Sequence, residues 1–213
     1  MNEEERLIIL KTEEMIDEIK TICSNFGLGN ASSEYKIITE VFLYKFLNDK
    51  FLYEVKQVDE RLAKLEKPKD VEIALNKMKD EYEFLLLRLK PDTAKLKVEH
   101  LISYLFSHKN DDDFYKLFDN TLVDIANFNL DIFSVKTGGK EKIRLFDPLS
   151  PYITETNKKS KFCRAIIDKL VEFSFEGLFK QKYDAFAIIF EHLIKDYNKD
   201  FGKYAEYYTP NTI

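Results

Sequence analysis

The sequence predicts a mainly α protein, a multi-helix bundle with one small β-hairpin near residues 132–146. Apolar residues recur every three to four positions through most of the chain, the period of an amphipathic helix. Only 6 glycines and 5 prolines occur in 213 residues, and most of them lie between the periodic segments. A hydrophobic content of 45% with 33% charged residues excludes a disordered chain. A chain of this length buries about 70% of its extended surface, enough for one sizeable core.

The first helix is predicted from the apolar spacing between Leu7 and Phe26. Gly27 or Gly29 ends it, because glycine readily adopts the left-handed conformation that closes a helix. The same glycines allow a second interpretation, a turn against a cofactor. They follow a helical pattern rather than a strand and lack the third glycine of the dinucleotide spacing, so the helix end is favoured.

A second, long helix is predicted from a cap at Ser32 or Ser33, with apolar positions that continue to residue 65. Pro68 ends this helix or begins the next one, whose apolar stripe covers residues 71–89. The two stripes could form an exposed antiparallel arm with coiled-coil packing, suited to protein binding. Each half is shorter than the three to four heptads that a coiled coil needs, so packing within a bundle is favoured.

Two shorter helices are predicted over residues 98–106 and 113–127. The acidic run 111–113 precedes the second of them, where the helix dipole favours negative charge, and needs no metal to explain it. From residue 131 the pattern changes, and β-type runs at 132–136 and 142–146 flank a Gly-Gly turn, which predicts the hairpin. Helices resume over residues 159–173 and 184–199.

Composition limits the classes of function. Cys23 and Cys163 lie far apart and are interpreted as buried, reduced thiols, and the three histidines form no metal-binding motif, so no metal site is predicted. No apolar run is long enough to cross a bilayer, and the acidic start is unlike a signal peptide. We expect a cytoplasmic protein without a membrane partner. A net charge of −5 argues against a free-standing DNA-binding module.

Two basic clusters are nevertheless candidates for contacts to the phosphates of double-stranded DNA. One surrounds the predicted hairpin, and the other begins the helix that follows it. Their members are Lys140, Lys142, Arg144, Lys158, Lys159, Lys161 and Arg164. The alternative is a solvated surface without a ligand, which is the commoner fate of such clusters.

The last twelve residues, 202–213, read Gly-Lys-Tyr-Ala-Glu-Tyr-Tyr-Thr-Pro-Asn-Thr-Ile. Thr209 is a good N-cap, and Pro210 suits the first position of a helix, where its missing N–H costs nothing. Only the first turn of that helix is present. We therefore expect the chain to be a piece of a longer protein.

This end of the chain resembles the junction between two domains in the methylation subunit of type I restriction-modification systems. The resemblance rests on Asp184-Ala185-Phe186, on the Gly-(x)n-Glu-Tyr-Tyr-Thr-Pro run of residues 202–210, and on the order of features before them. It implies that residues 1–201 form the helical N-terminal domain and that residues 202–213 open an S-adenosylmethionine-dependent methyltransferase domain. The full protein would transfer a methyl group to N6 of an adenine flipped out of the duplex.

The resemblance also implies a cofactor site and partners. The residues that would line the S-adenosylmethionine pocket are Glu206, Tyr207, Tyr208, Thr209, Pro210 and Asn211. The implied partners are a specificity subunit, a second methylation subunit and a restriction subunit, with the helical domain docking the specificity subunit and helping to enclose DNA. The glycine-rich turn and the Asn/Asp-Pro-Pro-aromatic loop of such enzymes are absent from these 213 residues. We therefore expect no catalytic residue, no bound cofactor and no activity in this span alone.

Other interpretations stay open. The tyrosines of the tail could pack it against the bundle without touching a ligand. The protein could be a single-chain, type II-like adenine methyltransferase whose recognition part lies further along the chain. It could also be a non-enzymatic helical interaction module, since no complete catalytic constellation is present.

Overall fold

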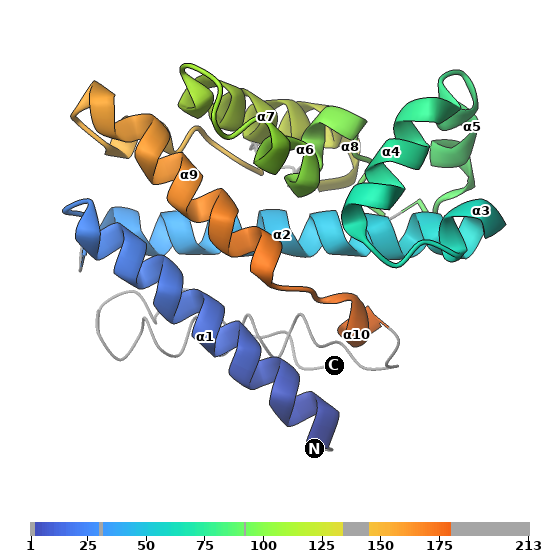
Figure 1. Ribbon diagram of the computed structural model, residues 1–213, viewed down its shortest axis with the longest axis horizontal. Coiled ribbons are helices and arrows are strands. Elements are labelled where there is room, and N and C mark those ends of the chain that lie inside the picture. Colours follow the sequence, from blue (N-terminus) through green and yellow to red (C-terminus); the bar gives the residue numbers. More distant parts are fainter. Residues whose placement is uncertain (1–2, 30–31, 92, 134–144, 180–213) are drawn as a thin grey trace, which may run out of the picture.

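A computed structural model describes residues 3–29, 32–91, 93–133 and 145–179, and these residues form a mainly helical bundle with no strand among them (Figure 1). The predicted fold class is therefore confirmed. The elements are α1 (Glu3–Asn25), α2 (Ser32–Val58), α3 (Glu60–Ala63), α4 (Pro68–Met78), α5 (Glu81–Arg88), η1 (Val98–His100), α6 (Ile102–Ser107), α7 (Phe114–Phe128), α8 (Leu130–Phe133), η2 (Ser150–Tyr152), α9 (Thr156–Glu172) and α10 (Glu176–Phe179), where η marks a 3₁₀ turn.

Helix α2 is the axis around which the other helices are arranged. Its 27 residues give it a length of about 40 Å at 1.5 Å per residue, and in Figure 1 it runs along the long dimension of the molecule. Helices α1 and α10 contact it from one side, while α3 and α5 contact its C-terminal end. Helix α9 packs against α1, α6 and α7 and so joins the two sides of the bundle.

One continuous core fills the space between these helices. The helix predicted over residues 113–127 is present as α7, in which Phe114, Phe118 and Ile125 are fully buried. Helix α9 buries Phe162, which meets the ring of Phe26 edge to face at a centroid distance of 5.4 Å. In both helices the buried apolar residues recur three to four positions apart, so each helix turns one face to the core.

Helix α1 ends where the glycines predicted it to end. Gly27 has φ of +79°, a conformation that favours glycine. The N–H of Leu28 donates to the carbonyl of Cys23 at 2.8 Å, and the N–H of Gly27 donates to Ser24 at 3.0 Å, the pair of bonds that defines a Schellman motif. Gly27 is therefore a helix cap.

Two of the predicted helices are broken where continuous helix was expected. Helix α2 ends at Val58, because Asp59 leaves the helical conformation (φ −136°) and its carboxylate accepts the N–H groups of Arg61 and Leu62 as the cap of α3. The guanidinium of Arg61 is the main cause that lowers the pKa of Asp59 to about 2. The stripe of residues 71–89 is divided into α4 and α5 at Lys79, whose φ is +46°.

The choice between an exposed arm and bundle packing is resolved by α4. This helix begins at Pro68, packs on α6 and η1, and buries Val71 and Leu75 in the common core. Helix α5 folds back on α2. The segment is part of the bundle.

The predicted hairpin falls mostly on residues 134–144, outside the described residues. Of its described ends, Ile132 and Phe133 belong to the short helix α8, and residues 145–146 are in no strand. The predicted helix over residues 184–199 also lies outside the described residues. Both cysteines are buried free thiols, as predicted, and burial raises the pKa of Cys23 to about 12. No helix among the described residues has the length and apolar character needed to span a membrane.

Glu40 joins α2 to the segment before η2. Its Oε2 accepts the N–H of Asp147 at 3.2 Å, and Lys36 Nζ lies 3.7 Å from its Oε1 and 2.7 Å from Asp147 Oδ2. Only 9% of the Glu40 side chain is exposed, whereas Lys36 and Asp147 are largely in solvent. Burial is the main reason that the pKa of Glu40 is raised to about 7.

We expect Glu40→Gln to flatten the pH dependence of stability between pH 5 and 8. Because the folded-state pKa of Glu40 lies above its unfolded value, the native protein binds the extra proton in this window and loses stability as the pH rises through it. The loss is about 1–2 kcal/mol after allowance for solvent screening of the neighbouring charges. Urea unfolding at pH 5 and pH 8 measures it, with exposed Glu66→Gln as control. Equal pH dependence in wild type and Glu40→Gln would contradict this assignment.

Candidate functional site

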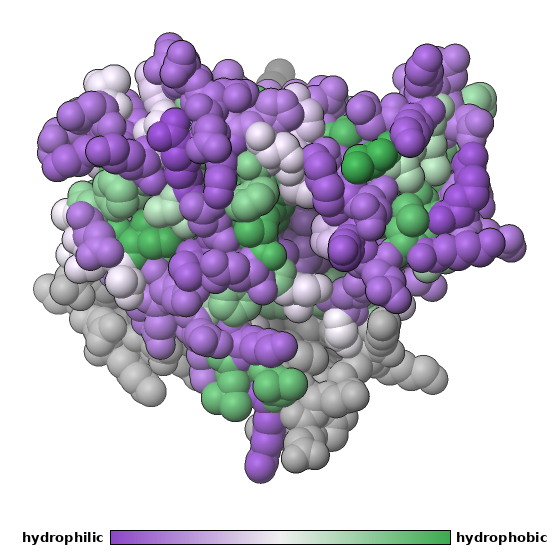
Figure 2. Space-filling model, in the orientation of Figure 1, coloured by the Kyte–Doolittle hydropathy of each residue, from purple (hydrophilic) through white to green (hydrophobic). Residues whose placement is uncertain are grey.

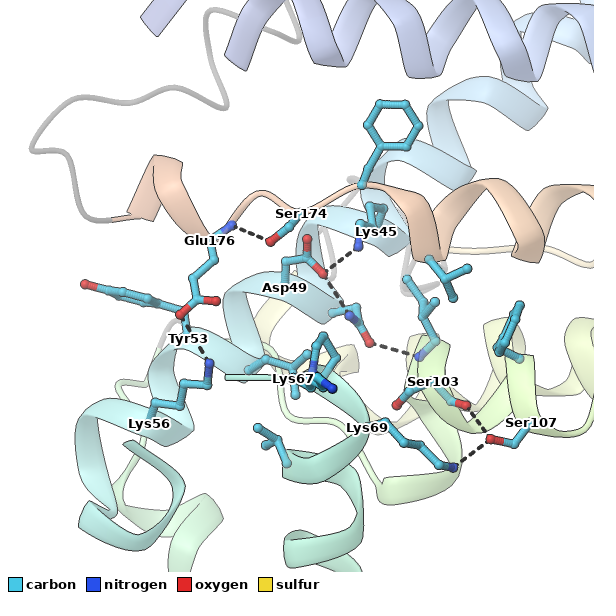
Figure 3. Close-up of a pocket in the computed structure, with 18 residues that line it drawn as sticks. Lys45, Asp49, Tyr53, Lys56, Lys67, Lys69, Ser103, Ser107, Ser174 and Glu176 are labelled. Carbon is cyan, nitrogen blue, oxygen red and sulfur yellow. Dashed lines mark hydrogen bonds and ion pairs between the residues drawn. The ribbon is translucent and has the colours of Figure 1, made fainter. Parts of the chain in front are cut away.

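The structure contains a pocket of about 380 Å³ between α2, α4, α6 and the linker that joins α9 to α10. This volume lies within the range of small-molecule sites. Figure 3 shows the four walls, with α2 and the linker on one side and α4 and α6 on the other. The pocket is lined by Lys45, Asn48, Asp49, Leu52, Tyr53, Lys56, Lys67, Pro68, Lys69, Val71, Ile102, Ser103, Phe106, Ser107, Val171, Phe173, Ser174 and Glu176.

A buried polar cluster on α2 forms one end of the pocket. Asp49 Oδ1 accepts from Lys45 Nζ and from Asn48 Nδ2, both at 2.9 Å, and all three residues are at most 6% exposed. Asp49 Oδ2 accepts the backbone N–H of Phe175 at 2.8 Å, and Asn48 Oδ1 accepts that of Ile102 at 3.0 Å. The cluster therefore binds α2 to the start of α6 and to the α9–α10 linker.

Three further lysines stand around the pocket. Lys56 is 3.2 Å from Glu176 of α10, and Lys69 Nζ lies 2.7 Å from Glu72 Oε1 and 2.6 Å from Ser107 Oγ. Lys67 is exposed and forms no ion pair within the part of the chain that the structure describes. The pocket thus carries one lysine whose charge the described residues leave uncompensated.

The rest of the lining is apolar, apart from the hydroxyl groups of Tyr53 and Ser174 and two more on the wall formed by α6. Leu52, Val71 and Ile102 are buried and form part of the lining, and Phe106 is partly exposed to solvent. On α6, Ser107 Oγ donates to the carbonyl of Ser103 at 2.9 Å. Ser103 Oγ itself is buried and makes no hydrogen bond to any described residue.

The acidic groups of the pocket are already paired with lysines. The carboxylates that touch the pocket, Asp49 and Glu176, are both held in ion pairs, and the lining includes no cysteine or histidine. Across the described ranges, no three His, Cys, Asp or Glu side chains gather as a metal-binding group. The pocket offers positive charge and an apolar floor.

A second polar cluster surrounds His100 and is structural. The ring is 2% exposed, its Nδ1 accepts the N–H of Lys97 at 3.1 Å, and its Nε2 lies 2.7 Å from Asp124 Oδ2. Because Nδ1 accepts, the neutral tautomer carries its proton on Nε2 and donates it to Asp124. Burial lowers the pKa of His100, so the ring stays neutral in the fold. The backbone carbonyl of His100 accepts a hydrogen bond from the hydroxyl of Tyr44.

The second predicted DNA-binding cluster lies at the start of α9, but its members do not form one free basic surface. Lys158 is 2.5 Å from Glu155, and Lys159 lies over the ring of Tyr115. Arg164 is turned inward and donates to the carbonyls of residues 109 and 111. Lys161 is exposed and has no ion pair among the described residues.

The other predicted site residues lie outside the described residues. This applies to Lys140, Lys142 and Arg144 of the first basic cluster. It also applies to the whole proposed cofactor element, residues 206–211.

Sequence reasoning missed the pocket. One signal was present, since Lys45, Asn48 and Asp49 interrupt the apolar stripe of α2 between Phe42 and Leu52 at the spacing of buried positions. Polar residues at such positions are buried only when they have partners. The partners come from residues 102 and 175, far away in the sequence.

The chain was compared with protein-family models, curated proteins and solved structures, and no match was found in any of the three comparisons.

Proposed function

We propose that residues 1–201 are the helical N-terminal domain of a type I restriction-modification methylation subunit, and that residues 202–213 begin its methyltransferase domain. The observation that carries the proposal is the run Gly202, Glu206-Tyr207-Tyr208-Thr209-Pro210, which follows the described helices in the sequence. A mainly helical bundle in the residues before it is what such a domain requires. The full protein would methylate adenine N6 with S-adenosylmethionine, in the cytoplasm.

In this proposal the bundle docks the specificity subunit and helps to enclose DNA. Exposed apolar side chains suit a protein partner, and α5 presents Phe84 and Leu87, which are 68% and 74% exposed. Figure 2 shows a mostly hydrophilic face with several separate hydrophobic areas. Lys161 on α9 is exposed and available for a phosphate contact, which would orient a duplex without reading its sequence.

The test is methyl transfer by the natural gene product, purified from its host by an affinity tag together with the proteins bound to it. We expect transfer of labelled methyl groups from S-adenosylmethionine to adenine in unmethylated host DNA, and a specificity subunit among the bound proteins. Tyr207→Ala combined with Tyr208→Ala removes aromatic surface from the cofactor pocket. It should lower the affinity for S-adenosylmethionine by about ten- to a hundred-fold.

The matched control is the double change of Tyr207 and Tyr208 to phenylalanine, which keeps the rings and should bind the cofactor within a few-fold of wild type. Methyl transfer without a separate specificity subunit would favour the single-chain enzyme. A gene product that transfers no methyl group and binds no specificity subunit would overturn the proposal in favour of the interaction module.

A further inference from the structure

We propose that the pocket between α2, α4, α6 and the α9–α10 linker binds a small amphipathic anion, an apolar ring body that carries a single negative charge. This ligand is a free small molecule. The inference is independent of the methyltransferase proposal, because it rests only on the geometry of the described residues.

The charge of the ligand follows from the ion pairs around the pocket. Four lysines line it, and three of them are matched by Asp49, Glu72 and Glu176. Lys67 is the fourth, and it forms no ion pair with any described residue. Partnered charges contribute little net attraction, so the unmatched lysine makes a monoanion the complementary ligand.

The body of the ligand follows from the lining. The walls between the charged groups are formed by Leu52, Val71, Ile102, Phe106 and Phe173, which favour an apolar ring. Figure 3 shows Lys67 beside the pocket, where its ammonium group would meet the negative charge of the ligand.

Two fluorescent probes test the inference on the chain of residues 1–213 at low salt. The anionic probe is 8-anilinonaphthalene-1-sulfonate, and the neutral one is N-phenyl-1-naphthylamine, which has the same aromatic body without the sulfonate. We expect one saturable site for the anion, with about three- to five-fold tighter binding than for the neutral probe. Lys67→Ala should abolish this preference, since the Lys67 side chain makes no capping hydrogen bond to α4 and its loss leaves the fold intact.

A second variant fills the pocket instead of changing its charge. Val171 is 39% exposed and lines the pocket, so Val171→Trp should weaken both probes without lowering the urea midpoint. Lys77→Ala, at the other end of α4, is the control and should bind as wild type does. Equal affinity for the two probes in wild type would overturn the inference. So would anion binding that survives both variants and is lost in Leu87→Ser, because it would place the probe on the exposed surface of α5.

Discussion

Asp49→Ala is expected to lower the free energy of unfolding by about 3–5 kcal/mol, because it leaves a buried charge without its partner. Asp49 is 6% exposed and neutralises Lys45, which is 4% exposed, through a contact of 2.9 Å. The same substitution also strands the N–H of Phe175 in the core. Urea unfolding followed by circular dichroism gives the difference in free energy.

Two further variants separate the buried charge from the loss of any ion pair. Asp49→Asn keeps an acceptor for the Phe175 N–H but does not neutralise Lys45. We therefore expect its free energy of unfolding to lie between those of wild type and Asp49→Ala. Asp17→Ala removes a surface pair with Lys20, whose atoms are 3.7 Å apart, and should change stability by less than about 0.5 kcal/mol. A similar small change in Asp49→Ala would mean that the α2 cluster is not a buried anchor.

Phe162→Ala is expected to lower the free energy of unfolding by about 3–5 kcal/mol, because it leaves a cavity in the core. The ring is fully buried on α9 and packs edge to face on Phe26, at the place where α9 meets α1. Thermal unfolding should show a clearly lower midpoint, and urea unfolding gives the difference in free energy.

The control for this substitution is Phe84→Ala on α5. The Phe84 side chain is 68% exposed, so the same chemical change should alter stability by less than about 0.5 kcal/mol. If the two variants were equally stable, α9 would not be part of the core that the structure shows.

The longer described helices could be predicted from the sequence because each depends on residues three and four positions apart. Phe114, Phe118 and Leu122 of α7 define its buried face locally, and the structure buries all three. The breaks could not be predicted in the same way. Lys79 adopts a positive φ, although lysine carries no signal for that conformation. Its conformation divides a stripe that looks continuous in sequence, so that α5 can fold back on α2.

The pocket depends on contacts that local periodicity does not record. Lys45 and Asp49 are four residues apart and could be suspected as a pair on one helix face. Their third partner, the N–H of Phe175, lies 126 positions away from Asp49. The spacing of residues along the chain predicts which side of α2 is buried, but only the tertiary fold determines which residues contact that side.

The packing of α9 on α1 has a consequence for synthesis at the ribosome. The N-terminal helices emerge first, yet α9, which packs on α1, begins only at Thr156. The nascent chain must therefore carry uncovered apolar surface until α9 has been synthesised. Chaperone demand should be highest before residue 172 leaves the exit tunnel and should fall once α9 can dock.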